Sequence, residues 1–301
     1  MTLEGMTPEG MTLEAMTLEA MTLEGMSLDP RLRLGFIGAG NMARSLIGGL
    51  LAAGHPASNL IAADPDPGQR AAAAALGGVA TSADNGAVAA GADVIVLAIK
   101  PQVMGVVCRA LQQQLRPGTL LISIAAGIRL DAIERWLGPV PVVRCMPNTP
   151  ALLRAGITAL TGNAFTGADQ LAIAAAVLGA VGKTAVLDSE TQLDAVTAIS
   201  GSGPAYFFLF TEALIEAGIR LGLAPDLARA LAVETAHGAA RMALDTAGTL
   251  AQLRGSVTSP NGTTEAAVAA FEAGGLRTLV DRAATAARDR SIALADELGT
   301  D

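Results

Sequence analysis

Aromatic residues are scarce in this chain: Phe, Tyr and Trp make up 3% of its 301 residues. A surface that binds single-stranded nucleic acid by stacking bases on aromatic rings is therefore not expected. The formal net charge is −8, and no run of basic residues occurs. This charge balance argues against nucleic acid or an anionic membrane as a partner.

Cysteine and histidine are rare as well, with two of each. Cys108 and Cys145 have neither metal-ligand spacing nor a disulfide framework, which fits a reducing cytoplasm. His55 and His237 have no partner at ligand or triad spacing, so we interpret both as packed or solvated side chains. No segment is long and apolar enough to span a bilayer. We therefore expect a cytoplasmic protein without a metal site.

The chain opens with six pentapeptides that each begin with Met, from M-T-L-E-G to M-S-L-D-P. A period of five residues places no continuous apolar stripe on a helix or a strand. The segment also lacks the basic and apolar regions of a signal peptide. We predict that residues 1–30 form a disordered tail, and that the rest is long enough for two domains.

A glycine turn follows the first apolar segment of the folded part. Residues 32–37 predict a strand, and residues 45–51 predict a helix. Between them, the first glycine permits a tight turn, the second lets a pyrophosphate approach the backbone, and Ala43 replaces the third glycine of the dinucleotide-binding pattern. A plain tight turn is the alternative. The residues predicted to bind the dinucleotide here are Gly38, Gly40, Asn41 and Met42.

An acidic residue follows the second predicted strand, which covers residues 60–63. At this place a carboxylate commonly accepts a hydrogen bond from the ribose 2′-OH of NADH and repels the 2′-phosphate of NADPH. Asp64 is the candidate. The alternative is that Asp64 or Asp66 caps the helix that follows.

Three later segments end at the same edge of the predicted sheet, where open α/β sheets bind ligands. Lys100 follows an apolar strand at 93–99 and is placed to face the cofactor, although a solvated lysine is the alternative. Ala126 lies in a small-residue turn that lets a nicotinamide ring approach the backbone. Asn148 is either a partner of the nicotinamide carboxamide or a turn residue. Two edge strands are expected at 156–160 and 184–187.

After residue 187 the alternation of strands and helices ends. Helices are predicted at 193–199, from Pro204 to residue 221 with Gly222 as its end, from Pro225 to about residue 246, and at 276–298. The helix that starts near Pro204 is apolar on most sides, which implies burial in a bundle or at a subunit interface. We therefore predict an α/β Rossmann-type dinucleotide-binding domain at 31–188, followed by an all-α dimerisation domain at 189–301.

A polar segment at 256–265 leads into one of these helices. Thr263 and Thr264 fall in its first turn, where backbone N–H groups lack partners and the helix dipole favours an anion. The segment therefore predicts a pocket for a small carboxylate. An ordinary N-cap is the alternative.

Five motifs resemble those of the pyrroline-5-carboxylate reductase family and occur in the family's order across residues 32–298. The usual form of the last motif has Gly where this chain has Asn261, and Asn is the non-glycine residue that best tolerates positive φ. The motifs are G-F-I-G-A-G-N-M-A at 35–43, A-I-K-P at 98–101, C-M-P-N-T-P at 145–150, S-G-S-G-P-A-Y at 200–206 and V-T-S-P-N-G-T-T-E at 257–265.

The resemblance implies NAD(P)H-dependent reduction of 1-pyrroline-5-carboxylate to L-proline, the last step of proline biosynthesis, by hydride transfer to a cyclic imine. Members of the family often use NADPH, whereas Asp64 favours NADH or the use of both cofactors. Both NADPH and NADH are therefore retained as candidates. The family builds its site from two subunits. This implies a homodimer, with assembly into a larger ring such as a decamer left open.

The resemblance also assigns roles to residues. Thr264 is implied as the catalytic hydroxyl that bonds the ring nitrogen and relays its proton. Glu190 aligns with an acid near that nitrogen, although a surface glutamate is the alternative. The other implied substrate-binding residues are Ser259, Gly262 and Thr263, and the other implied cofactor contacts are Asn85, Ala98 and Pro101.

Two other functions compete with this interpretation. One is a related Rossmann enzyme that acts on another imine or on a β-hydroxy acid, a class that usually offers a catalytic lysine in its helical domain. The other is a nucleotide-sensing oligomer that has the fold without the activity.

Overall fold

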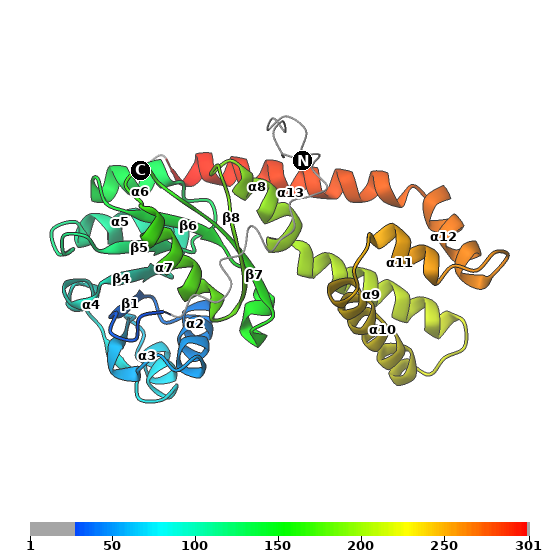
Figure 1. Cartoon of the computed structure of the whole chain (residues 1–301), viewed down its shortest axis with the longest axis horizontal. Coiled ribbons are helices and arrows are strands. Elements are labelled where there is room, and N and C mark those ends of the chain that lie inside the picture. Colours follow the sequence, from blue (N-terminus) through cyan, green and yellow to red (C-terminus); the bar gives the residue numbers. More distant parts are fainter. Residues whose placement is uncertain (1–27, 300–301) are drawn as a thin grey trace, which may run out of the picture. The chain divides into compact units, whose positions relative to one another are not determined.

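A computed structural model describes residues 28–299 (Figure 1). The chain divides into two compact units. The first runs to Gly201 and resumes at Arg288, and the second comprises Ser202–Ala287. These bounds are not those of the predicted domains, which meet at residues 188 and 189. The predicted tail lies mostly in residues 1–27, outside the described residues.

The first unit contains an eight-stranded sheet within the described residues, in the order β3-β2-β1-β4-β5-β6-β7-β8. The first six strands are parallel, and their order 3-2-1-4-5-6 is that of a Rossmann fold. The strands are β1 (Leu34–Ile37), β2 (Leu60–Ala63), β3 (Ala80–Ser82), β4 (Val94–Leu97), β5 (Leu120–Ser123), β6 (Val142–Met146), β7 (Gly156–Gly162) and β8 (Gly182–Val186).

The helices of this unit connect the strands and cover the sheet (Figure 1). They are α2 (Asn41–Ala52), η2 (Ala57–Asn59), α3 (Pro67–Ala74), α4 (Asn85–Gly91), α5 (Pro101–Leu111), α6 (Leu130–Leu137), η3 (Thr149–Leu153), α7 (Ala168–Gly179) and α8 (Gln192–Val196).

The central strands are apolar on both faces because helices cover both sides of the sheet. In β4, Val94 and Val96 belong to a core shared with α2 and α7, whereas Ile95 and Leu97 belong to a second core shared with α5 and α6. All four residues of this strand are buried. The continuous apolar run that predicted this strand therefore reflects two separate cores.

The expectation of two edge strands near residues 156 and 184 is wrong in part. Strand β8 is an edge, but β7 lies inside the sheet, antiparallel to β6 and parallel to β8. The antiparallel pairing is possible because the short η3 turn, rather than a crossover helix, connects β6 to β7.

A single turn of π-helix, η4 (Thr197–Gly201), follows α8 and ends where the second unit begins. Sequence reasoning predicted one helix over residues 193–199. The structure instead has a short α-helix that widens into the π-turn, and the S-G-S-G-P motif follows directly.

The second unit is helical throughout its regular structure. Its helices are α9 (Gly203–Arg220), α10 (Pro225–Asp245), α11 (Leu250–Ser256), α12 (Thr263–Ala273) and the first part of α13 (Leu276–Leu298). Large apolar side chains of this unit are exposed in the single chain, among them Phe207, Phe208 and Leu209 on successive positions of α9. The expectation that this helix is apolar on most sides agrees with this surface.

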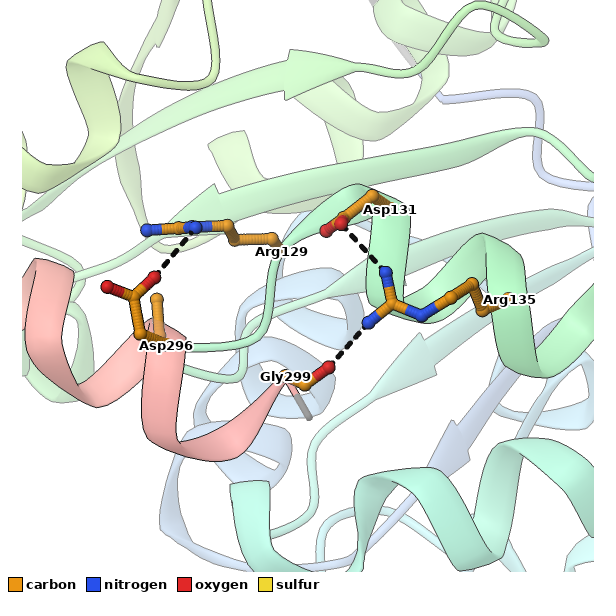
Figure 2. A pocket seen from close by; sticks show the side chains of 6 residues that line it. Arg129, Asp131, Arg135, Asp296 and Gly299 are labelled. Atoms are coloured by element: carbon orange, nitrogen blue, oxygen red, sulfur yellow. Dashed lines mark hydrogen bonds and ion pairs between the residues drawn. The ribbon is translucent and has the colours of Figure 1, made fainter. Parts of the chain in front are cut away.

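The last turns of α13 belong to the first unit and contact it through polar side chains. Ser291 Oγ donates to Asp194 at 2.8 Å. Arg129 forms an ion pair with Asp296 at 2.9 Å, and Arg135 donates to the Gly299 carbonyl oxygen. Figure 2 shows these charged groups around a small pocket, in which each arginine points toward an oxygen partner. The end of α13 is thereby fixed to the α/β unit.

Candidate dinucleotide and carboxylate sites

The glycine turn between β1 and α2 has the shape that a dinucleotide requires. Gly38 has φ +96°, and a Cβ there would collide with the Ala98 carbonyl oxygen. Gly40 is the N-cap of α2, has no side-chain cap, and has nothing within 4 Å of the place where a Cβ would lie. The backbone at Gly40 is therefore open to a ligand, and the first N–H groups of α2 lack intrahelical acceptors at the positive end of the helix dipole, which suits a pyrophosphate.

The β2–α3 loop separates the two acidic candidates. Asp66 caps α3 by accepting from Gly68 N at 2.7 Å, so the capping alternative is correct for this residue. Asp64 instead braces the glycine turn: its Oδ2 accepts from Ala39 N and its Oδ1 from Asp66 N, both at 2.9 Å. A ribose contact by Asp64 stays a prediction, and two oxygens with remaining lone pairs allow it.

The other predicted cofactor residues lie at the ends of neighbouring strands. Ala98 follows β4 and donates its N–H to Ile37 O at 2.8 Å, next to the glycine turn. Lys100 is exposed at the N-cap of α5, and Pro101 is the first residue of that helix. Ala126 is exposed after β5, and Asn85 is the first residue of α4. Because these strands are parallel neighbours, the segments share one edge of the sheet.

Asn148 has a structural contact. Its Oδ1 accepts from Ile157 N at 3.0 Å, which ties η3 to the start of β7. This contact agrees with the alternative of a turn residue. The predicted bond to a nicotinamide carboxamide stays a prediction, for which the Asn148 side-chain NH₂ and the second lone pair of Oδ1 remain.

Glu190 is engaged with a buried cation. Its Oε1 accepts from Arg144 Nη1 at 2.6 Å and from Leu130 N at 2.8 Å. The Arg144 side chain is 6% exposed and that of Glu190 is 25% exposed. The pair joins β6 to the segment before α8. A role for Glu190 at the substrate nitrogen stays a prediction, but the carboxylate has a partner within its own unit.

The predicted carboxylate site lies in the second unit, at the start of α12. Gly262 is the N-cap, and no side chain caps the helix. Asn261 has φ +59°, so the expected left-handed turn is confirmed. Its N–H donates to Glu265 Oε2 at 2.7 Å, and Gly262 N donates to Ser259 O at 3.0 Å. These bonds fix the turn and leave the N–H groups of Thr263 and Thr264 at the helix tip without intrahelical acceptors.

Burial removes the cysteines from consideration as nucleophiles. It raises the pKa of the Cys108 thiol to about 12, and it also raises the pKa of Cys145. His55 is packed, with Nε2 3.0 Å from Leu32 O, and burial lowers its pKa. Within residues 28–299 no group of metal-ligating side chains could hold a metal ion. The helices of that part of the chain also include none with the length and apolarity to cross a membrane.

Sequence reasoning missed Arg44, which lies in α2 just after the glycine turn. Its guanidinium reaches back to the Ala39 carbonyl oxygen at 2.7 Å and to Asn41 Oδ1 at 2.5 Å. It also bonds the Gln69 side chain in the first turn of α3. A basic residue one position after the glycine pattern was the available signal.

The parallel order of β1–β6 and the glycine turn at α2 define a dinucleotide-binding protein of the Rossmann class. Residues 33–127 match a family model described as NADP oxidoreductase, coenzyme F420-dependent, and residues 190–294 match the pyrroline-5-carboxylate reductase dimerisation model. The chain belongs to the pyrroline-5-carboxylate reductase family, because it is 53% identical over 268 residues to that enzyme from Pseudomonas aeruginosa, covering 89% of this chain and 98% of the relative.

Solved structures agree with this assignment. The pyrroline-5-carboxylate reductase of Coxiella burnetii matches with a TM-score of 0.85 and 43% identity, over 87% of this chain and 98% of that one. The Plasmodium falciparum pyrroline carboxylate reductase, solved with NADP bound, matches with a TM-score of 0.78 and 29% identity, over 88% of this chain and 99% of that one.

These matches confirm the predicted family, fold class, enzyme type and activity, which is the reduction of 1-pyrroline-5-carboxylate to L-proline. The predicted cofactor, NADPH or NADH, is confirmed by the NADP oxidoreductase match. The predicted homo-oligomer is confirmed only in part: the match shows that the chain has a dimerisation domain. The residue roles stay predictions.

Proposed function

We propose that this pyrroline-5-carboxylate reductase holds the dinucleotide on the glycine turn and the substrate carboxylate at the tip of α12 while it reduces the imine to L-proline. The observation that carries the proposal is that two helix N-termini within family motifs have no side-chain cap, as is also the case for other helices such as α5 and α6. One, at α2, lies in the α/β unit, and the other, at α12, lies in the helical unit. Each offers backbone donors to an anion.

The chemistry needs positioning more than it needs a strong acid. The reduced nicotinamide supplies a hydride to the C=N carbon. A cyclic imine is basic enough to be protonated near neutral pH, and the resulting amine keeps that proton. The protein then has to hold the substrate ring against the nicotinamide and fix its carboxylate. The two buried cysteines, whose pKa values are raised by burial, are not suited to act as nucleophiles, and this reaction does not require one.

The start of α12 can supply both tasks on the substrate side. We assign the carboxylate to the backbone N–H groups at Thr263 and Thr264, with the Ser259 hydroxyl and the Gly262 backbone beside them. The Thr264 side chain is half-buried, whereas that of Thr263 is exposed. Thr264 is therefore the better placed hydroxyl to bond the ring nitrogen and relay its proton.

The position of lysine argues against the related β-hydroxy-acid enzymes. Lysine occurs in the sequence only at positions 100 and 183. Both positions lie outside residues 202–287, so the helical unit cannot offer a catalytic lysine. A cyclic imine, which activates itself by protonation, does not need one.

We also propose that the oligomer is an obligate homodimer whose site combines the α/β unit of one subunit with α12 of the other, with a larger ring such as a decamer built from such dimers. The exposed apolar side chains of α9 support a large apolar interface. Size-exclusion chromatography with light scattering tests this, and a fully active monomer would refute it. We place the enzyme in the cytoplasm, since a reducing compartment suits its two free thiols.

The activity is tested by following NADPH and NADH oxidation with 1-pyrroline-5-carboxylate as substrate. Thr264→Ala is expected to lower kcat by ~10–100-fold, the loss typical of one positioned proton-transfer group. Thr278→Ala is the matched control, because Thr278 is an exposed threonine of α13 in the same unit. Wild-type turnover in Thr264→Ala would remove this hydroxyl from the mechanism. Absence of turnover in the wild-type protein would refute the proposed function.

A further inference from the structure

We propose that Arg44 and Asp64 together set the choice between NADPH and NADH, with Arg44 attracting the 2′-phosphate and Asp64 opposing it. The inference rests on the proposed function, because it concerns the cofactor of the same reaction. The discrimination between NADPH and NADH is assigned to two side chains that both bond Ala39 of the glycine turn. Asp64 accepts from the Ala39 N–H, and Arg44 donates to the Ala39 carbonyl oxygen.

The Arg44 guanidinium keeps its positive charge available. Its partners are the Ala39 carbonyl oxygen, the Asn41 side-chain oxygen and the Gln69 side-chain oxygen, all of them neutral. Three of its five N–H donors at most are needed for these bonds. A planar cation with spare donors is the group that proteins use for bidentate recognition of phosphate.

The same contacts place Arg44 at the adenosine end of the dinucleotide site. Ala39 belongs to the glycine turn, and Gln69 lies in the first turn of α3, just beyond the loop that follows β2. In this fold the ribose of the adenosine half lies between the glycine turn and the end of β2. The guanidinium therefore bridges the two segments between which a 2′-phosphate would enter.

Asp64 lies at the same end of the site and acts in the opposite direction. Its two oxygens are held by Ala39 N and Asp66 N, so the carboxylate is fixed close to the turn rather than free to swing into solvent. Each oxygen has lone-pair capacity left for a ribose 2′-OH. A phosphate at that place would meet the same negative charge at close range.

Arg70 is the rival candidate for the phosphate. Its Nη1 donates to the carbonyl oxygens of Asp64 and Pro65, at 2.7 and 2.9 Å. These bonds fold the guanidinium over the β2–α3 loop and support the shape of that loop. Arg44 is favoured because it contacts both sides of the ribose position, whereas these bonds of Arg70 lie on the β2–α3 side alone.

Calorimetric binding to the full-length protein tests the assignment without relying on turnover. The ligands are NADP⁺, NAD⁺ and the fragments 2′,5′-ADP and 5′-AMP, which differ from each other by the 2′-phosphate alone. Arg44→Gln is expected to raise Kd for NADP⁺ and 2′,5′-ADP by about 10–100-fold, because a charge-assisted contact is lost, and to leave NAD⁺ and 5′-AMP nearly unchanged.

Asp64→Asn is expected to act in the other direction, tightening NADP⁺ several-fold and weakening NAD⁺. Arg109→Gln, which removes the same charge from the exposed side of α5, is the matched control and should change neither Kd. Arg70→Gln should lower affinity for both dinucleotides alike, through the shape of the loop.

Equal losses for NADP⁺ and NAD⁺ in Arg44→Gln would overturn the assignment, as would a selective loss in Arg70→Gln instead. In both cases the wild-type protein would still bind dinucleotide and reduce the imine, so the proposed function would stand. A wild-type protein that bound neither dinucleotide would overturn both proposals.

Discussion

Replacing Glu190 with alanine removes the carboxylate that accompanies the buried guanidinium of Arg144. The Arg144 side chain is 6% exposed, so water cannot replace the lost partner fully, whereas the 25% exposure of Glu190 admits some solvent. Breaking a buried pair costs about 3–5 kcal/mol, and this partial exposure points to the lower end, about 3 kcal/mol. The loss of the bond to Leu130 N acts in the same direction.

The expected result is a fall in the thermal midpoint of roughly 6–12 °C at fixed protein concentration, from the usual 2–4 °C per kcal/mol for a unit of this size. Circular dichroism melting measures it. The double variant Arg144→Met with Glu190→Leu is the control, because it removes both charges and should be destabilised less than Glu190→Ala.

Steady-state kinetics on the same variants separates the two roles considered for Glu190. If the residue is structural, KM for the imine should stay near the wild-type value at temperatures where Glu190→Ala is folded. An unchanged melting temperature together with a tenfold higher KM would refute the structural interpretation and place the carboxylate at the substrate.

Two further predictions concern the glycine turn and an ion-pair cluster. Gly38→Ala combines a positive φ of +96° with a collision against a backbone carbonyl, so the soluble yield or the affinity for dinucleotide should fall sharply, as measured by calorimetry; normal binding would show that the turn can adapt. Asp93 hydrogen-bonds Arg33 and Arg116, and this lowers its pKa from 3.8 to about 2. Because the folded pKa is depressed, the stabilisation is complete above the unfolded value and is lost as the pH falls from about 4 to 2. Asp93→Asn should therefore lower the melting temperature at pH 7 more than at pH 2.5, and an equal loss at both pH values would contradict this.

Local signals in the sequence were sufficient for much of the helical unit. The last helix was expected at residues 276–298, and α13 has these bounds. Gly222 was expected to end α9, and it follows that helix with φ +99°. Pro225 opens α10 as expected. Proline and glycine act through their own backbone dihedral angles, so their effect does not depend on distant residues.

Pairing between distant segments was the part that sequence could not supply. The antiparallel position of β7 depends on how η3 turns, and a strand pattern alone does not record direction. The contacts of Asp64 with the glycine turn and of Glu190 with Arg144 join residues 25 and 46 positions apart. Asp64 was named as a candidate from its place after the second predicted strand and Glu190 from the family resemblance, but their partners become visible only once the chain is folded.

The return of α13 to the first unit makes the helical unit an insertion within the α/β chain rather than a C-terminal appendage. Residues 288–299 supply Ser291, Asp296 and Gly299 to contacts with Asp194, Arg129 and Arg135. A gene fragment that stopped at codon 201 would thus encode an α/β unit without its closing segment. An exchange of the helical unit between relatives would need two splice points, one after Gly201 and one before Arg288, to leave the nucleotide-binding unit intact.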